Sequence, residues 1–332
     1  MSARVPLPPQ PAGLDWPTHD WPLGEPPRGF RLPDAPEFGA THALVLCWRG
    51  RVVLERYGPE HGPATPHISW SVAKSVLHAL VGVLVRDGKL DPAARADVPA
   101  WRGAGDPRGA ITLEQLLRMR SGLAWREDYV DAQQSDVIEM LFGRGKDDVA
   151  AFAAELPLAS SPDTTWCYSS GTSNLVASLA GRAIGGGGDA CAAFLRRELF
   201  ARIGMASATV RCDAAGTWIG SSFVFATARD FARFGQLYLR DGVWEGERIL
   251  PVGWVEHARR ETPGSAGEYG AHWWLPLRGE GMFSANGYRG QYVFVAPARD
   301  VVAVRLGDST AEQQPLVREW LADVIAQFPL LS

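Results

Sequence analysis

The chain has 332 residues, of which 46% are hydrophobic and 21% charged, and its formal net charge at pH 7 is −4. These values are those of a globular protein with a large core, and arginines scattered among acids give no support to nucleic-acid binding. Four cysteines without C-x-x-C spacing argue against a disulfide scaffold, and no apolar run is long enough to predict a membrane span. We therefore expect a soluble cytoplasmic protein, and we expect it to be a monomer or a homodimer.

The first part of the chain predicts an irregular arm followed by a β-hairpin. Residues 1–36 are rich in proline, which disfavours a regular helix or a central strand. We expect this arm to lie over the body of the protein and to be held there by Trp16 and Trp21. Residues 43–48 and 52–57 are apolar segments on either side of a short turn, which is the pattern of a hairpin.

The next predicted element is a helix that begins near Ser71 and ends at Gly88. Ser71 and Lys74 are three residues apart and share one helix face, so Oγ and Nζ can form a hydrogen bond. Lysine occurs only at positions 74, 89 and 146, and Lys74 has apolar neighbours. A desolvated lysine can act as a neutral base, whereas an arginine cannot. This pattern indicates a nucleophile beside its base, and a surface lysine at a helix start is the alternative.

The middle of the chain is predicted to be mostly helical. Thr112 and Gln115 form a capping-box pattern. The glycine run at 185–188 is predicted to end a helix, since no strand precedes it and no Lys-Ser/Thr follows it as in a phosphate loop. The expected helices cover residues 112–119, 147–156, 174–184 and 227–240.

Strand patterns return near the end of the chain. Residues 291–295 and 301–306 predict a second hairpin. A final helix is expected to start at Pro315 and to present an apolar stripe made of Leu316, Trp320, Val324 and Phe328.

These elements predict an α+β fold in which an antiparallel sheet is built from both termini, with flanking helices and an inserted helical region. The expected organisation is an N-terminal arm at 1–40, a sheet region at 41–70 and 220–332, and a mostly helical region at 71–219. A catalytic cleft is expected between the last two.

Tyr168 is a candidate for moving a proton to the leaving group. It lies in the sequence Trp166-Cys-Tyr-Ser-Ser170. Its phenol could shuttle a proton if a neighbouring cation favours the phenolate. A core tyrosine with a satisfied hydroxyl is the alternative that composition alone leaves open.

The order Ser71-Val-Ala-Lys74, Tyr168-Ser-Ser170 and Gly287-Tyr-Arg-Gly-Gln291 resembles serine hydrolases of the class C β-lactamase and penicillin-binding superfamily. The resemblance runs from about residue 42 to 328. It is closest to the 6-aminohexanoate-dimer (nylon-oligomer) hydrolases and the β-lactamase-like esterases of family VIII. Further similar stretches are Glu127-Asp-Tyr-Val-Asp131, Thr227-Ala-Arg-Asp230 and Trp273-Trp274.

The resemblance implies a role for each matching residue. Ser71 is the acyl-enzyme nucleophile, Lys74 its general base and Tyr168 the residue that protonates the leaving group. The backbone N–H groups of Ser71 and Tyr288 form the oxyanion hole. The residues implied in substrate binding are Tyr129, Ser170, Trp274 and Gly287.

We expect no metal and no cofactor. The seven histidines form no His-x-x-x-His or His-Glu pair of the kind that binds zinc. No Gly-x-Ser-x-Gly sequence occurs, which argues against an α/β-hydrolase.

Two departures from the family pattern bear on the substrate. Where β-lactamases and cell-wall peptidases carry Lys-Thr-Gly, this chain has Ala285-Asn286-Gly287, and the segment after Tyr129 is shorter than in nylon-oligomer hydrolases. We therefore expect a serine hydrolase for small carboxylic esters or linear amides. The alternatives are a β-lactamase or D-amino peptidase, and a non-catalytic binding or scaffold protein of the same fold.

Overall fold

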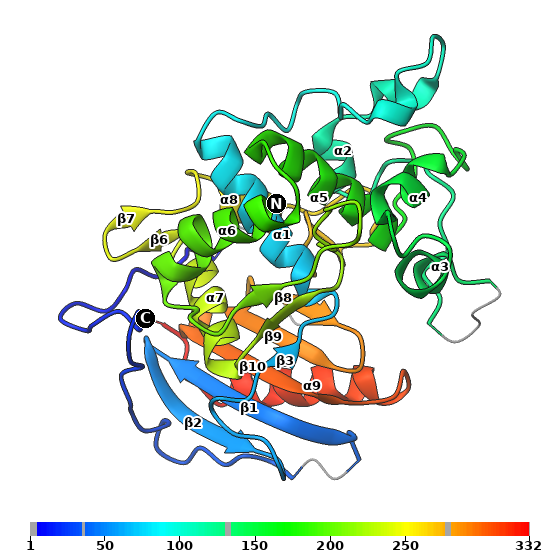
Figure 1. Cartoon of the computed structure of the whole chain (residues 1–332). Coiled ribbons are helices and arrows are strands. Elements are labelled where there is room, and N and C mark those ends of the chain that lie inside the picture. The colour runs from blue at the N-terminus through cyan, green and yellow to red at the C-terminus, as the bar shows by residue number, and fades with distance from the viewer. Residues whose placement is uncertain (1–4, 35–36, 130–133, 276–279, 332) are drawn as a thin grey trace.

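The computed structural model describes residues 5–34, 37–129, 134–275 and 280–331. Its main sheet is antiparallel with the strand order β2-β1-β10-β9-β8 (Figure 1). The N-terminal hairpin pairs directly with the last strand, as Val45 opposite Val304 illustrates. The predicted α+β fold, with a sheet drawn from both ends of the chain, is therefore confirmed. The five strands are β1 (Ala40–Trp48), β2 (Arg51–Tyr57), β8 (Phe283–Gly287), β9 (Gln291–Ala296) and β10 (Val301–Asp308).

Helix α9 (Gln313–Ala326) covers one face of this sheet. The predicted stripe was wrong at Leu316, which is 48% exposed, whereas the adjacent Val317 is buried. The buried face of α9 consists of Val317, Trp320, Leu321, Val324 and Ile325, which recur at three- and four-residue spacing, and Leu316 lies outside this face.

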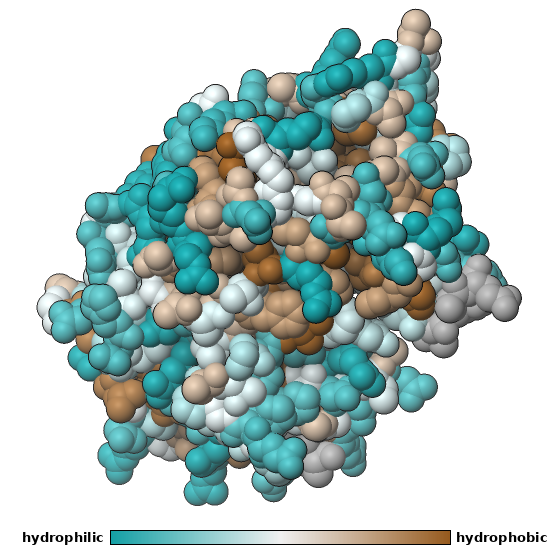
Figure 2. All heavy atoms as spheres, viewed as in Figure 1, coloured by the Kyte–Doolittle hydropathy of each residue, from teal (hydrophilic) through white to brown (hydrophobic). Residues whose placement is uncertain are grey.

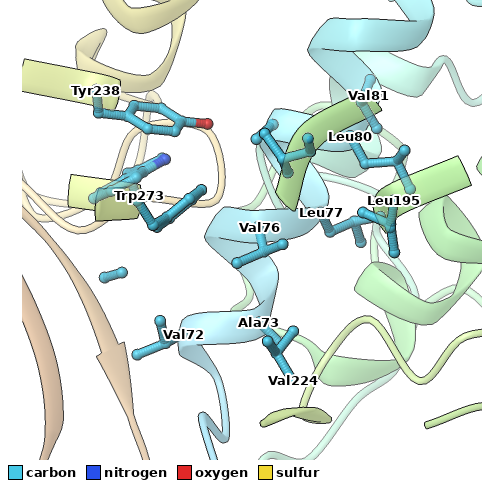
Figure 3. Close-up of a cluster of buried hydrophobic side chains, with 14 of the residues drawn as sticks. Val72, Ala73, Val76, Leu77, Leu80, Val81, Leu195, Val224, Tyr238 and Trp273 are labelled. Carbon is cyan, nitrogen blue, oxygen red and sulfur yellow. The ribbon is translucent and has the colours of Figure 1, made fainter. Parts of the chain in front are cut away.

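The opposite face of the sheet is covered by α1 (Val72–Arg86) and α7 (Ala228–Leu239). Thirteen of the fifteen residues of α1 are buried, which is typical of a helix enclosed on all sides. Figure 3 shows Val76 on the side of Trp273 and Tyr238, while Leu77 lies beside Leu195. This helix, which carries Lys74, is the centre of the largest core cluster.

The remaining helices form the region above the sheet in Figure 1. The capping box at Thr112 is present, as predicted. Helix α5 begins at Ser170, four residues before the predicted start, because the Ser169 side chain caps it. Gly185 ends α5 in the left-handed conformation, and an unpredicted helix follows it. These helices are α2 (Leu113–Leu117), α3 (Asp136–Phe142), α4 (Val149–Glu155), α5 (Ser170–Ile184), α6 (Gly188–Leu195) and α8 (Trp254–Arg259).

In the described part of the chain, five short strands form two further small sheets, with the strand orders β3-β5-β4 and β6-β7. β3 lies immediately before the Ser71 helix and pairs with β5, so the chain enters α1 from a small second sheet. The short strands are β3 (His67–Ile68), β4 (Thr209–Val210), β5 (Val224–Ala226), β6 (Val243–Trp244) and β7 (Glu247–Arg248).

The N-terminal arm lies against the body and is held by its tryptophans, as predicted. Trp21 is 5% exposed, and its Nε1–H donates a hydrogen bond to the Arg229 carbonyl at 3.2 Å. The Trp16 and Trp244 rings are 5.0 Å apart.

In the view of Figure 2, hydrophobic residues gather in the middle of the face, where the helical region meets the sheet region. Among the residues that the structure describes, no helix is both long and apolar enough to cross a membrane.

We predict opposite effects for two Gly→Ala substitutions within helices. At Gly82 of α1, an added Cβ would lie 2.4 Å from Trp254 Nε1, whereas Gly181 of α5 has open space. Gly82→Ala should lower the free energy of unfolding by about 1–3 kcal/mol through overpacking. Gly181→Ala should raise it by roughly 0.5–1 kcal/mol through helix propensity.

Urea denaturation of the two variants and the wild type measures both effects. Equal stabilisation by the two substitutions would show that α1 does not pack against Trp254 as described.

Candidate active site

Ser71 lies at the N-cap of α1 with its backbone in the helical region, and the residue is 9% exposed. The residue before it, Trp70, has a positive φ of 45°, which is strained for a non-glycine residue and is a feature found at functional sites. Lys74 follows one turn later and is only 2% exposed. Its Nζ donates a hydrogen bond to Ser71 Oγ at 3.0 Å. The predicted serine and lysine contact is therefore present.

Lys74 Nζ has two further hydrogen-bond partners. It donates to Ser170 Oγ at 2.9 Å and to the Ser221 carbonyl at 3.0 Å. An ammonium group has three N–H donors, and each has an acceptor here. A neutral amine would keep the bonds to Ser170 and Ser221 and turn its lone pair toward Ser71.

The electrostatics of the site bring such a neutral amine within reach of physiological pH. Burial lowers the pKa of Lys74 to about 8, while the negative charge of Glu127 acts in the opposite direction. Desolvation disfavours the charged form of an amine, and it outweighs the carboxylate here. Lys74 is thus poised to accept a proton.

Glu127 is a site residue to which sequence reasoning assigned no role. Its carboxylate accepts hydrogen bonds from Ser170 N–H at 2.8 Å and Ser170 Oγ at 2.6 Å. It also accepts from Trp125 Nε1–H at 2.5 Å and from the Tyr129 hydroxyl. Its only signal in the sequence was its place in the Glu127-to-Asp131 stretch, of which positions 130 and 131 lie outside the described residues.

The structure places Ser170 behind the base. Its hydroxyl donates to Glu127 and is left with lone pairs that accept from Lys74 Nζ. Ser170 is 1% exposed and is not among the residues that line the cavity described below. This geometry favours a role in positioning Lys74 over the predicted contact with substrate.

Tyr168 lies beside both members of the pair. Lys74 Nζ is 4.9 Å from the centroid of its ring. Burial, and then the charge of Glu127, raise the pKa of Tyr168, and hydrogen bonding with Ser71 offsets this only in part. The neighbouring cation therefore does not favour the phenolate, which was the condition stated for a proton shuttle. Tyr168 is a protonated hydroxyl that can donate.

A cavity of about 590 Å³ opens over Ser71. A separate cavity of about 380 Å³ beside α4 and α5 contains none of the predicted site residues, so it is not the candidate site. The predicted residues that line the cavity over Ser71 are Ser71, Tyr129, Tyr168, Trp274, Gly287 and Tyr288.

The end of β8 lies close to the nucleophile because of a glycine. A Cβ at Gly287 would lie 2.3 Å from the Ser69 carbonyl oxygen, so a larger residue would push the strand away. The Tyr288 ring packs at 4.7 Å from Tyr129 and 5.7 Å from Trp70. Within the described ranges, neither the Ser71 N–H nor the Tyr288 N–H has a hydrogen-bond acceptor. Both are available to an oxyanion.

A second, apolar cavity of about 210 Å³ also reaches Ser71. Ser71 therefore borders both cavities, and the smaller one is the more apolar. The apolar walls are Trp70, Val137, Ile138, Leu141 and Phe142, most of them from α3.

The sequence matches the family described as Beta-lactamase over residues 38–327. It is 28% identical over 312 residues to a 6-aminohexanoate-dimer hydrolase of Paenarthrobacter ureafaciens, covering 87% of this chain and 78% of that protein.

Two solved structures are similar in fold. A putative 6-aminohexanoate-dimer hydrolase from Bacillus anthracis has a TM-score of 0.75 and 24% identity, over 86% of this chain and 79% of that chain. A family VIII carboxylesterase has a TM-score of 0.64 and 15% identity, over 87% of this chain and 93% of that chain. At these identities the likeness shows the shared fold.

We predict that kcat/KM rises with pH through a midpoint near 8, because only neutral Lys74 can take the Ser71 proton. Glu127→Gln removes the negative charge that raises the pKa of Lys74. The midpoint should therefore move to lower pH in this variant.

A pH series of ester hydrolysis in wild type and Glu127→Gln tests both statements. A profile that falls as pH rises toward 8, or a midpoint that moves upward in the variant, would contradict a neutral lysine base.

Proposed function

The chain belongs to the Beta-lactamase family, and we propose that it is a serine hydrolase that cleaves small carboxylic esters or linear amides through an acyl-enzyme. The observation that carries this proposal is the 3.0 Å contact between Ser71 Oγ and the buried Lys74 Nζ at the wall of a cavity. Acyl transfer requires a nucleophile in contact with a base whose pKa lies near the operating pH.

In the acylation step that we propose, neutral Lys74 takes the proton of Ser71 Oγ as this oxygen attacks the substrate carbonyl carbon. The N–H groups of Ser71 and Tyr288 stabilise the resulting oxyanion. When the tetrahedral intermediate collapses, the bond to the leaving group breaks and Tyr168 donates its proton to that group. The Lys74 ammonium then returns a proton to Tyr168.

In the deacylation step that we propose, Lys74 is the base again and Ser71 Oγ is the leaving group. A water molecule loses its proton to Lys74 and attacks the acyl carbon, and Ser71 Oγ leaves with a proton from the lysine. Both residues are then restored to their starting state.

The apolar cavity beside Ser71 supports esters with a hydrophobic acyl group as the preferred substrates. Its walls offer apolar surface, and burial of each methylene group contributes about 0.8 kcal/mol. A family VIII carboxylesterase is among the proteins of similar fold.

Linear amides are the second candidate, and two residues of the polar cavity favour them. Asn286 Oδ1 is buried, and in the part of the chain that the structure describes it has no donor. It could accept a substrate N–H. Arg318 has no ion pair with a described residue, and its charge could receive a carboxylate on the substrate. The 28% identical relative is named a 6-aminohexanoate-dimer hydrolase.

We predict that a fluorophosphonate probe labels Ser71 and that p-nitrophenyl butyrate is hydrolysed. Ser71→Ala should abolish both. Lys74→Arg should lower kcat/KM by roughly 10²–10⁴-fold, because arginine keeps the charge but cannot take a proton. Lys89→Arg, at an exposed lysine, is the matched control and should leave the rate unchanged.

Mass spectrometry of the labelled peptide and steady-state rates provide the measurements. An unlabelled Ser71 in active-site titration would remove the hydrolase proposal and favour a binding or scaffold protein. Comparison with aminohexanoate dimer and nitrocefin would rank esters against amides and β-lactams.

We predict that kcat/KM for p-nitrophenyl esters increases from acetate to hexanoate, because the longer acyl chain reaches the apolar cavity. Ile138→Trp should remove this increase by filling the cavity, while acetate is still hydrolysed. If Ile138→Trp lowered the rates with acetate and hexanoate by the same factor, this cavity would not be the acyl site.

A further inference from the structure

Three histidines from three separate elements meet at one place outside the catalytic cavity. His42 lies on β1, His61 in the loop after β2, and His67 on β3. One nitrogen of each lies within 4.8 Å of one nitrogen of the others. The ring centroids of His42 and His61 are 4.2 Å apart, and those of His61 and His67 are 5.2 Å apart.

The backbone holds this cluster in place. The Gly58 N–H donates to the His42 carbonyl at 3.0 Å, and the His61 N–H donates to the Gly58 carbonyl at 3.1 Å. His67 pairs with Ala226 across the small sheet. The loop that carries His61 is therefore tied back to β1, beside the start of the sheet.

Two nitrogens of the cluster lack the hydrogen bonds that buried polar atoms require. His61 Nδ1 and His67 Nε2 are both buried, and neither has a partner among the described residues. The whole His67 side chain is only 8% exposed. Nearly all buried polar side-chain atoms are paired in folded proteins, so two unpaired imidazole nitrogens in one cluster point to a ligand.

Burial lowers the pKa of two of the three imidazoles. Burial and the two neighbouring imidazoles lower the pKa of His67 to about 4. Burial and the charges of His61 and Arg305 lower the pKa of His42, and Asp308 offsets this only in part. Neutral imidazole is the form that binds metal ions, whereas three protonated rings would repel one another.

We propose that His42, His61 and His67 form a binding site for Zn²⁺, with water as the fourth ligand. A donor set made only of imidazole nitrogens suits zinc and related transition metals and disfavours Ca²⁺ and Mg²⁺, which require oxygen ligands. Zn–N bonds of about 2.0–2.1 Å would bring the three nitrogens to roughly 3.4 Å from one another. The present separation, within 4.8 Å, would shorten when the ion binds, and half-exposed His42 and His61 leave a path for the ion.

The position of the site indicates a structural role. None of the three histidines lines either cavity at Ser71. A bound ion would connect β1, the loop after β2 and β3, and β3 leads directly into the strained Trp70 and the nucleophile. This inference does not depend on the proposed hydrolase activity.

The test uses full-length protein without a histidine tag, stripped of metal with a chelator and titrated with Zn²⁺ against a chromophoric competitor. We expect one Zn²⁺ per chain. His61→Gln should weaken binding by at least about tenfold, and His19→Gln, at an exposed histidine away from the cluster, should bind as the wild type does. Replacement by Co²⁺ should give the intense visible absorption of a four-coordinate ion.

A second measurement separates loss of the ligand from loss of the fold. Zn²⁺ should raise the melting temperature of the wild type and of His19→Gln but not that of His61→Gln, whose circular dichroism and ester hydrolysis should match the metal-free wild type. The proposal is overturned if the wild type binds no Zn²⁺, if His61→Gln binds as tightly as the wild type, or if Co²⁺ shows only the weak spectrum of a six-coordinate ion.

Discussion

The desolvation of Lys74 is the physical constraint on which the rest of this structure depends. A lysine at the surface would be protonated near neutral pH and could not accept a proton. Helix α1 is buried on nearly all sides, between the sheet and the helical region, and this enclosure lowers the pKa of the amine to about 8. The cost of burying an amine is offset by three hydrogen bonds that no single element could supply, because they come from Ser71, Ser170 and Ser221.

Glu127 adjusts this balance, whereas burial pushes the pKa values of Lys74 and Tyr168 apart. Its charge raises the pKa of Lys74 against the effect of burial, and it also raises the pKa of Tyr168. Burial, with the carboxylate as a second cause, keeps the phenol protonated, and burial also brings the amine within reach of neutral pH. Groups whose pKa values are pushed apart in this way can serve as acid and base in the same reaction. The connection to Lys74 through the Ser170 hydroxyl also fixes where the amine points.

The backbone around Ser71 is shaped by contacts that are distant in sequence. Trp70 adopts its strained conformation where its ring packs against Tyr288, and Gly287 allows β8 to approach Ser69. Ser71 and Tyr288 both line each of the two cavities, and within the described ranges their N–H groups have no hydrogen-bond acceptor. The histidine cluster lies at the other end of the short strand that leads to this turn. The segment that leads to Ser71 therefore contacts Tyr288 and β8 at one end and carries His67 of the cluster at the other.

The sequence by itself determined what neighbouring residues decide: both hairpins, the Thr112 capping box, the helix after Ser71 and the α+β class. Turn chemistry, capping and hydrophobic period act over a few residues and can be read locally, and the order of the motifs indicated the superfamily. Only the tertiary structure decided which side of α9 faces the sheet, that Glu127 reaches Ser170, and that His42, His61 and His67 meet. Each of these depends on the path of loops and on packing between distant elements. Hydrogen bonds and charges act through space, so the residues that tune Lys74 have no fixed spacing along the chain.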